Sequence, residues 1–278
     1  MAGSSATPEA LRPITFLSDY GTEDEFAGVC RAVIARIAPA ANVIDLTHGI
    51  PRHDVAQGAA VLANALPYAP PGVHLAVVDP GVGSPRKAVA VRVADEGRVL
   101  VGPDNGLLGP AIERLGGAVE AADVSLSPVR LEPISATFHG RDIFAPVAAH
   151  VALGAGLAEL GEPMDPAELL TLERPAPVVE GGRVTAAVTY VDRFGNVALG
   201  LRADDLDETE LKLGRTAVVE ANGRERELPY ALTFADVPAG SPLLYLDSYG
   251  NLALAVNRGS AAELFGVGAG DTVALRRA

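Results

Sequence analysis

Residues Ala76–Arg86 read AVVDPGVGSPR, and they carry the clearest indication of the chain's architecture. An apolar run ends in an acid, Asp79, and a turn rich in proline and glycine then leads to Arg86. A buried strand that delivers a carboxylate at its carboxyl end is typical of the ligand-binding edge of an open α/β sheet. Gly81 and Gly83 have no β-carbon, so the backbone can approach a ligand closely. We therefore expect an α/β fold with a site at the end of this strand.

A second motif, Thr137–Phe144 (TFHGRDIF), places His139 in similar surroundings. Taken singly, an Asp-Pro-Gly turn is more often an ordinary loop, and a lone histidine is more often structural. Together, the two motifs offer a carboxylate, a guanidinium and an imidazole within plausible reach of one another. We therefore predict that Asp79, Arg86 and His139 form one site.

Apolar strands alternate with amphipathic helices on both sides of this stretch. The expected strands are Ile14–Leu17, Asn42–Leu46, Val73–Val78, Val89–Val93 and Val99–Val101, and the expected helices are Asp24–Ile37, Asp54–Leu66, Leu107–Leu115 and Ile143–Leu153. Such alternation predicts a layered α/β domain with a mostly parallel sheet, and we assign residues 1–172 to it.

The pattern changes after residue 172. Residues 173–182, ERPAPVVEGG, are rich in proline and glycine and are expected to form a linker. Residues 183–278 contain short strands separated by turns, which predicts a small β-barrel or sandwich as a second domain. Two similar phrases occur there, DRFGN at Asp192–Asn196 and DSYGN at Asp247–Asn251. They suit either a turn with positive φ or a polar heterocyclic ligand.

The composition excludes several classes of protein. The 278 residues are 49% hydrophobic, enough for a substantial core, and the formal net charge is −13 with no run rich in lysine and arginine. Nucleic acid is therefore not an expected partner, because its phosphates are bound mainly by basic side chains. Cys30 is the only cysteine, which excludes an intrachain disulfide and a cysteine-based zinc site.

Known motifs exclude further kinds of site. The 5 histidines show no HExxH spacing, so no metal is expected. Neither the phosphate loop GxxxxGK[ST] nor the nucleophile elbow GxSxG occurs. The first residues lack the apolar segment of a signal peptide, and no apolar stretch is long enough to span a membrane. We expect a cytoplasmic protein with no membrane association.

Asp19 follows the first expected strand and has two interpretations. A carboxylate at a strand end can accept both hydroxyls of a ribose. Alternatively, an acid here could cap the next helix, although Thr22 and Asp24 are better placed for that. We favour the ribose interpretation.

Eight motifs in order closely resemble the S-adenosyl-L-methionine (SAM) hydroxide adenosyltransferases, the SAM hydrolases related to the fluorinase and chlorinase. They are SDYGTEDEFAG, IDLTHGIPRHDV, VVDPGVGSPR, GPDNGLL, FHGRDIF, VDRFGN, TFAD and NRGSAAELFGV. The resemblance spans about Ile14 to Leu275. It implies an N-terminal α/β domain joined to a C-terminal β domain, SAM as the small-molecule substrate, and no cofactor. It also implies a homotrimer, with each site between one subunit's N-terminal domain and a neighbour's C-terminal domain.

The resemblance implies a water-activating role for Asp79, Arg86 and His139. Water or hydroxide would attack ribose C5′ in line and expel methionine, leaving adenosine. A sulfonium already leaves readily, so no acid is needed on that side. Arg86 would favour hydroxide, His139 could take the proton, and Asp79 could orient it or hold the water. The sequence leaves open which residue is the base.

Substrate contacts follow from the same resemblance. Asp19 would hold the ribose hydroxyls, while Asp192 and Ser248 would meet the methionine end, with Asp192 on the ammonium. Tyr249 stands where the fluorinase has an arginine, which puts the family's recognition of the methionine carboxylate in doubt here.

The adenine pocket is also implied by the resemblance. Phe194 and Phe234 would flank the ring, and Asn196 would bond its edge. Backbone near Asn257 and Arg258 would complete the pocket.

Two alternatives stay open at this point. One is a chlorinase-like, halide-dependent adenosyltransferase, and the other is a sensor that binds SAM or adenosine without useful turnover. The halogenases carry tyrosine at the position of Asp79, and the fluorinase has a halide-binding serine at that of Gly140. The fluorinase's extra loop is also absent between Val93 and Val101. These departures disfavour halogenation, because a carboxylate repels a halide.

Overall fold

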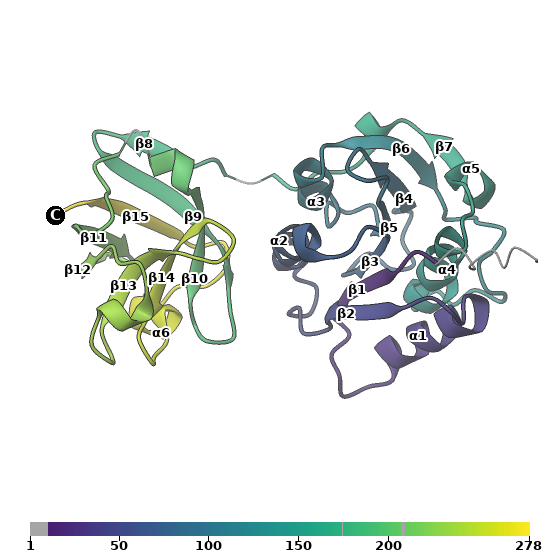
Figure 1. Cartoon of the computed structure of the whole chain (residues 1–278), viewed down its shortest axis with the longest axis horizontal. Coiled ribbons are helices and arrows are strands. Elements are labelled where there is room, and N and C mark those ends of the chain that lie inside the picture. The colour runs from purple at the N-terminus through teal and green to yellow at the C-terminus, as the bar shows by residue number, and fades with distance from the viewer. Residues whose placement is uncertain (1–10, 174, 207–208) are drawn as a thin grey trace, which may run out of the picture. The chain divides into compact units, whose positions relative to one another are not determined.

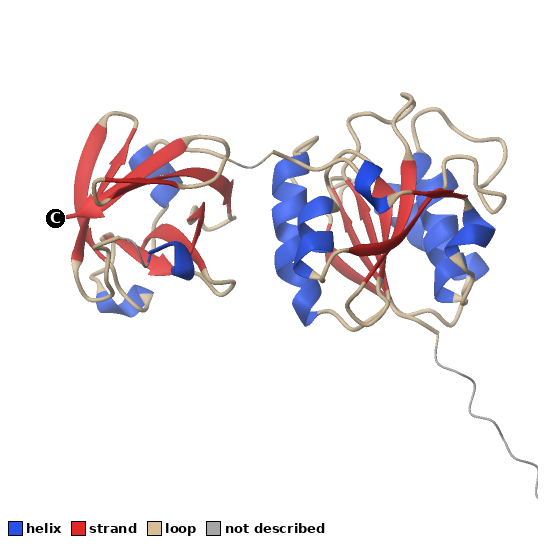
Figure 2. Ribbon diagram, turned by 90° about the horizontal axis from the view of Figure 1, so that it is seen from above, coloured by secondary structure: helices blue, strands red, loops and turns tan. Residues whose placement is uncertain are grey.

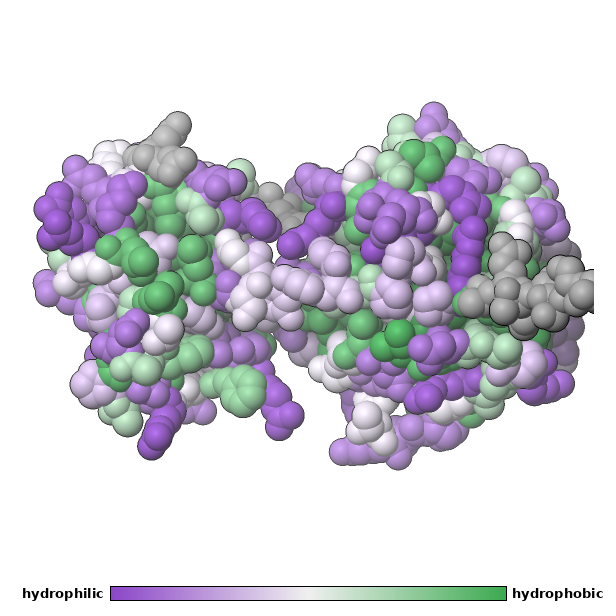
Figure 3. All heavy atoms as spheres, in the orientation of Figure 1, coloured by the Kyte–Doolittle hydropathy of each residue, from purple (hydrophilic) through white to green (hydrophobic). Residues whose placement is uncertain are grey.

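The computed structural model describes residues 11–173, 175–206 and 209–278, which divide between Leu172 and Glu173 into two compact units (Figure 1). In both, polar residues cover most of the visible surface, with smaller apolar patches between them (Figure 3). In the described part of the chain, no helix is long and apolar enough to cross a membrane. The cytoplasmic location stays a prediction.

The N-terminal unit is built on a seven-stranded sheet with the strand order β2-β1-β3-β5-β4-β6-β7. The strands are β1 Ile14–Ser18, β2 Val43–Thr47, β3 Val73–Val77, β4 Ala88–Val93, β5 Val99–Pro103, β6 Ala118–Asp123 and β7 Glu162–Met164. Strands β2, β1, β3 and β5 are parallel, and β4, β6 and β7 continue the sheet in antiparallel fashion. The predicted mixed α/β class is confirmed.

Helices cover both faces of this sheet (Figure 2). Helices α1 Phe26–Ile37 and α4 Ala145–Ala152 pack on one face, and α2 Val55–Ala65 and α3 Gly109–Arg114 pack on the other. Because every residue of β1 and of β3 is buried, both strands read as nearly continuous apolar runs. The remaining helical segments are η1 Leu66–Tyr68, η2 Gly140–Phe144, α5 Leu157–Leu160 and η3 Pro166–Glu168. Of these, η2 is a π-helix, so the helix expected from Ile143 begins earlier.

The C-terminal unit is an antiparallel sheet with the order β12-β11-β15-β9-β10-β14-β13, with β8 paired to β9. Its strands are β8 Val178–Glu180, β9 Arg183–Val191, β10 Val197–Arg202, β11 Thr216–Ala221, β12 Arg224–Pro229, β13 Pro242–Leu246, β14 Asn251–Val256 and β15 Thr272–Arg277. Its short helices are η4 Ala203–Leu206, η5 Phe234–Asp236 and α6 Ala261–Phe265.

This second sheet is nearly closed into a barrel. Tyr230, next to β12, forms an isolated bridge with Leu244 of β13, so the two ends of the strand order meet. The expected small β-barrel is confirmed. Strand β8 lies within the segment expected to be a linker, because Val178 and Val179 pair with Thr185 and Val184.

Candidate active site

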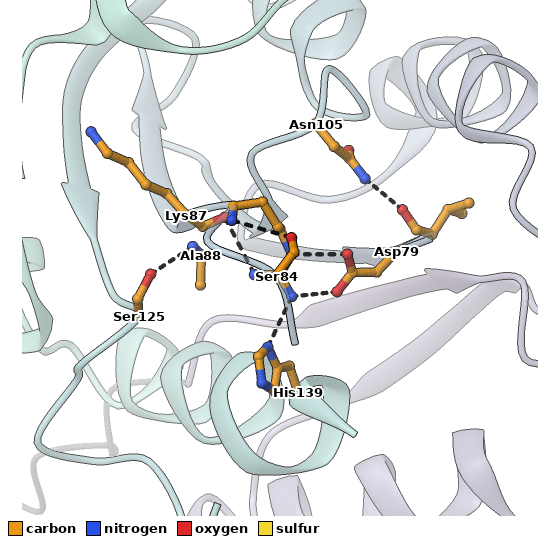
Figure 4. Close-up of polar contacts among 9 residues, drawn as sticks. Asp79, Ser84, Lys87, Ala88, Asn105, Ser125 and His139 are labelled. Carbon is orange, nitrogen blue, oxygen red and sulfur yellow. Dashed lines mark hydrogen bonds and ion pairs between the residues drawn. The ribbon is translucent and has the colours of Figure 1, made fainter. Parts of the chain in front are cut away.

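An acid and an arginine are paired at the carboxyl end of β3. Arg86 Nε donates to Asp79 Oδ1 at 2.8 Å, and Arg86 Nη2 donates to Asp79 Oδ2 (Figure 4). The side chains of Arg86 and Asp79 are only 10% and 6% exposed. Such a bidentate contact fixes the planes of both groups and holds the guanidinium in one orientation.

His139 joins this pair from the start of the π-helix. Arg86 Nη2 donates to His139 Nδ1 at 3.0 Å, and a guanidinium has no acceptor, so Nδ1 must be the acceptor. Neutral His139 therefore carries its proton on Nε2. Burial, and then the charge of Arg86, lower the pKa of His139 below its ordinary 6.5. The predicted assembly of Asp79, Arg86 and His139 is present in the structure, with the lone pair of His139 Nδ1 already engaged.

Local contacts explain how the two motifs come together. Asn105 donates to the carbonyl of Val78 at 2.9 Å and fixes the end of β3 (Figure 4). Gly83 has φ +78, and a β-carbon there would collide with the carbonyl oxygen of Ala136. A glycine is thus needed for the turn after β3 to approach the segment before His139. We expected this freedom to serve a ligand, but at Gly83 it serves packing.

Asp19 emerges beside this cluster because β1 and β3 are parallel neighbours in which Ser18 pairs with Val77. Its Oδ2 accepts the backbone N–H of His53 at 2.9 Å. Within residues 11–173, helix α1 has Glu25 at its N-cap, with no capping side-chain hydrogen bond. The capping alternative for Asp19 is therefore not observed.

Tyr20 was missed by the sequence analysis. Its hydroxyl lies against Gly140, where a β-carbon would collide with it. Burial raises the pKa of Tyr20 well above its ordinary 10, and Asp19 and Asp79 raise it further while Arg86 lowers it. The hydroxyl therefore keeps its proton and lies in electrostatic contact with the cluster. An aromatic residue directly after Asp19 was the available signal.

A cavity of about 430 Å³ opens onto the cluster. It is lined by Ser84, Pro85, Arg86, Lys87, Asp123, Ser125, Leu126, Arg130, Ile134, His139 and Ile143. Arg86 and His139 therefore border open space, although most of the Arg86 side chain is buried. No group of three or more His, Cys, Asp or Glu side chains could hold a metal ion among the described residues.

The C-terminal unit holds a larger cavity of about 700 Å³. Its lining comprises Tyr190, Asp192, Phe194, Asn196, Ala198, Phe234, Tyr245, Asp247, Ser248, Tyr249, Ala253, Val256, Arg258 and Gly259. The structure thus gathers most of the predicted substrate-binding residues of this unit around one space. Phe194 and Phe234 are 72% and 42% exposed, so two aromatic rings are partly accessible to a ligand, although Phe234 also packs against Tyr245.

Asn257 is the exception among the predicted residues, since it is not part of the described lining. Its amide donates to the carbonyl of Val237 at 2.8 Å. Its backbone N–H donates to Ser241 O, and its carbonyl accepts from Gly240 N. Asn257 therefore supports the wall, and its backbone is already paired.

The two similar phrases form matching loops beside this cavity. Asp192 Oδ1 accepts the N–H groups of Phe194 and Asn196, and its Oδ2 accepts the Asn196 amide at 2.8 Å. Gly195 has φ +79, as the turn requires.

The second loop repeats this pattern. Asp247 Oδ1 accepts the N–H groups of Tyr249 and Asn251, and its Oδ2 accepts the Asn251 amide at 3.0 Å. Gly250 has φ +80. The turn interpretation of the repeated phrase is therefore correct, and both loops also contribute to the cavity lining.

Tyr190, Tyr245 and Asp247 also line the cavity and were not predicted. Burial raises the pKa of Tyr245, and the carboxylates of Asp192 and Asp247 raise it further. The repeat of the DxxGN phrase was the only available signal for Asp247.

Comparisons with known proteins agree with this geometry. A family model described as the SAM hydroxide adenosyltransferase N-terminal domain matches residues 14–161, and its C-terminal counterpart matches residues 186–274. A protein of Salinispora tropica named (R)-S-adenosyl-L-methionine hydrolase is 48% identical over 93% of this chain and 95% of its own length. A Thermus thermophilus protein of the same name is 43% identical over 95% of this chain and 100% of its own length. A fluorinase of an Actinoplanes species is 30% identical over 95% of this chain and 97% of its own.

Two solved structures are also similar to this chain over nearly its whole length. An uncharacterized conserved protein from Thermotoga maritima superposes with a TM-score of 0.89 at 36% identity, over 95% of this chain and 100% of that one. A conserved hypothetical protein from Thermus thermophilus superposes with a TM-score of 0.75 at 41% identity, over 95% and 100%.

Proposed function

The chain belongs to the SAM hydroxide adenosyltransferase family, and from that premise we propose that it hydrolyses SAM to adenosine and L-methionine. The relationship to proteins named (R)-S-adenosyl-L-methionine hydrolase, at 43% to 48% identity over nearly the whole chain, carries this conclusion. The fluorinase is a more distant relative at 30% identity. Asp79 also disfavours a halide, since a halide has no proton to donate to the carboxylate that would offset the repulsion between the two charges.

In the proposed reaction, Arg86 and His139 stabilise the nucleophile. Around their cluster a water would meet donors, namely the one N–H of Arg86 Nη1 that is not already donated within the protein and the Nε2–H of His139. Hydrogen-bond donors lower the pKa of a bound water and so favour hydroxide. We therefore propose that this water loses its proton to solvent before it attacks C5′. Hydroxide oxygen then bonds to C5′ of the ribose while the bond from C5′ to sulfur breaks. The sulfur keeps the electron pair and leaves as the neutral thioether of methionine, so no acid is required.

Asp79 has a supporting role in this proposal. Both of its oxygens accept hydrogen bonds from Arg86, which holds the guanidinium in place. Its remaining lone pairs can orient the water through that water's own proton. Proximity and removal of bulk water are then the main sources of rate acceleration.

We assign recognition of adenine to the cavity of the C-terminal unit. Phe194 and Phe234 would stack on the two faces of the base. One of the two Nδ2 hydrogens of Asn196 is donated to Asp192, and its Oδ1 can accept from the exocyclic amine of adenine. Arg258 would supply the backbone contact, because the backbone N–H and carbonyl of Asn257 are already paired.

The rest of the substrate would be bound by polar side chains. Asp192 would take the ammonium of the methionine end, and Ser248 and Tyr249 would lie beside its carboxylate. Asp19 would accept the ribose hydroxyls, as its position after β1 suggests. No metal or other cofactor is needed in this scheme, because the sulfonium is already an excellent leaving group.

We also propose that the enzyme is a homotrimer, in which each site combines the N-terminal unit of one subunit with the C-terminal unit of a neighbour. The residues proposed for water activation and those proposed for adenine recognition lie in different units, which suits such sharing. Mixing and refolding Arg86→Ala with Phe234→Ala should then restore part of the activity that each variant has lost. Absence of restoration would argue against shared sites.

The hydrolysis itself is tested by chromatography of the purified protein with SAM, without halide and with a metal chelator. We expect adenosine and methionine from the wild type, and strong losses in Asp79→Ala, Arg86→Ala and His139→Ala. Formation of 5′-chloroadenosine only when chloride is added would instead indicate the halide-dependent alternative. Tight binding of SAM with no product under either condition would indicate the sensor.

A further inference from the structure

A buried serine and histidine lie directly beneath the loop that carries Asp19. Ser18 Oγ is 2.8 Å from His48 Nδ1, and Ser18 is fully buried while His48 is 9% exposed. His48 Nε2 lies 3.3 Å from Asp45 Oδ1, and Asp45 Oδ2 accepts from Arg31 at 2.6 Å. A serine, a histidine and an aspartate in line resemble a hydrolytic triad in composition. Ser18 is too deeply buried to meet a substrate, so another role must explain the arrangement.

Hydrogen bonds connect His48 to the loop of residues 18–21. Ser18 Oγ accepts the backbone N–H of Tyr20 at 3.3 Å, so its own proton can be donated to His48 Nδ1. His48 Nε2 lies 3.3 Å from Asp45 Oδ1 without making a hydrogen bond to it, so the side chain of His48 is held by Ser18. The carbonyl of His48 accepts the backbone N–H of Gly21 at 2.7 Å. His48 therefore holds the loop of residues 18–21 through both its side chain and its backbone.

We propose that His48 is a positioning residue for the ribose of the substrate. Asp19 is the one carboxylate of that loop, and its neighbours Ser18, Tyr20 and Gly21 are all tied to His48 directly or through Ser18. A ribose hydroxyl pair demands a carboxylate in one fixed orientation, which a loop supplies only when its backbone is held. This proposal rests on the proposed function, in which Asp19 binds the ribose.

The same strand provides a matched control. Thr15 Oγ1 lies 2.9 Å from His74 Nδ1, so it forms a second hydroxyl–imidazole pair, also buried. Thr15 precedes Ser18 by three residues, which places the second pair about 10 Å farther back along β1. It supports the sheet and does not touch the loop of Asp19. Removal of His74 should therefore destabilise the fold without affecting the ribose.

The experiment compares KM and kcat for SAM in wild type, His48→Ala, His48→Asn, Asp19→Asn, the double variant Asp19→Asn/His48→Ala, and His74→Ala. Loss of one hydrogen bond of the loop should raise KM roughly five- to tenfold in His48→Ala, with a smaller change in kcat. His48→Asn should recover most of this loss, because its amide can occupy the place of Nδ1. In the Asp19→Asn background, His48→Ala should add little, since both act through one carboxylate. His74→Ala should lower the Tm and leave KM unchanged.

Several outcomes would overturn the proposal. Independent, multiplying effects of Asp19→Asn and His48→Ala on KM would show that His48 does not act through Asp19. An equal rise of KM in His74→Ala would show a general effect of loosening the sheet. A raised KM in Asp19→Asn together with a normal KM in His48→Ala would refute the positioning role alone, while an unchanged KM in Asp19→Asn would refute the ribose assignment with it. A wild type that releases no adenosine would refute the proposed function itself.

Discussion

The two units display their functional groups in opposite ways. In the N-terminal unit, Asp79 and Arg86 are paired and nearly buried, with side chains 6% and 10% exposed. In the C-terminal unit, Phe194 and Phe234 are 72% and 42% exposed beside a cavity of about 700 Å³. The ion pair of Asp79 and Arg86 fixes the orientation of both groups before a substrate binds. The partly exposed aromatic rings of the C-terminal unit are available to contact a ligand. We therefore expect variants of the Asp79–Arg86 pair to lower kcat, and variants of the exposed aromatic residues of the C-terminal unit to raise KM.

The sharpest test of this division is loss of the Arg86 guanidinium. Arg86→Ala should lower kcat by roughly 10²–10³, because it removes the group that stabilises the nucleophile's charge, while KM changes little. Steady-state kinetics with SAM measure both. Asp79 would be left buried and unpaired, which costs about 3–5 kcal/mol of stability.

The double variant Asp79→Ala/Arg86→Ala controls for that instability, since it leaves no unpaired charge. Its Tm should recover while its kcat stays low. An effect of Arg86→Ala that fell mainly on KM would break the division between the units.

Loss of one stacking face in the C-terminal unit should have the next largest effect. Phe234→Ala should raise KM roughly ten- to hundredfold with kcat nearly unchanged, because stacking of a base on an aromatic ring is worth about 1–3 kcal/mol. Calorimetric titration with adenosine should show a parallel loss of affinity. Phe234→Tyr keeps the ring face and should bind normally; weakened binding by this control would argue against stacking.

The two matching loops of the C-terminal unit, Asp192–Asn196 and Asp247–Asn251, allow a comparison within that unit. Asp192→Asn and Asp247→Asn should lower the Tm to a similar extent, because each disturbs the same three hydrogen bonds. Only Asp192→Asn should raise KM for SAM, by about tenfold, since a hydrogen bond to a charged group is lost. Adenosine lacks the ammonium, so Asp192→Asn should weaken adenosine binding less than SAM binding, through the disturbed Asn196 amide alone. Equal effects of the two variants on KM would mean that Asp192 has no special contact with the ammonium.

The smallest expected effect concerns acid stability, where the two units differ because all 5 histidines lie in the N-terminal one. Burial, and then the charge of Arg98, lower the pKa of His74 to about 3, whereas an unfolded histidine titrates near its ordinary 6.5. Between these values the unfolded state binds a proton that the folded state does not. The free energy of unfolding should therefore fall by about 1.4 kcal/mol for each pH unit between 6.5 and about 3. Above pH 6.5 neither state binds this proton, so the stabilisation due to neutral His74 is fully present there.

Denaturant titrations of wild type and His74→Asn at pH 7 and 5.5 test this expectation. The variant should lose less stability on acidification. Equal losses would show that other groups control acid stability.

Much of the fold could be predicted because the buried strands are apolar and the helices are amphipathic. Strands β6 and β7 were missed, since AVEAAD and EPM lack the β-branched run that marks a strand. Strand β8 was hidden in a segment rich in proline and glycine, and it forms only because β9 offers an edge.

The candidate site also contains residues that the sequence could predict and residues that it could not. Asp79, Arg86 and His139 could be grouped because Asp79 ends an apolar run, Arg86 follows in the same motif, and His139 stands in a second polar motif. The contacts of Tyr20 could not, because they depend on packing against Gly140, which is distant in sequence. The role expected of Asn257 stays a prediction, and only the folded backbone reveals that its N–H and carbonyl already have partners within the unit.

The contact between Tyr20 and Gly140 also restricts the order in which this active site can evolve. A serine at position 140 would place a β-carbon where the Tyr20 hydroxyl now lies. Gly140→Ser alone should therefore be deleterious, and the same change should be tolerated once residue 20 is smaller, as in Tyr20→Leu. We therefore expect epistasis between the two positions, with Tyr20→Leu restoring part of the stability that Gly140→Ser loses.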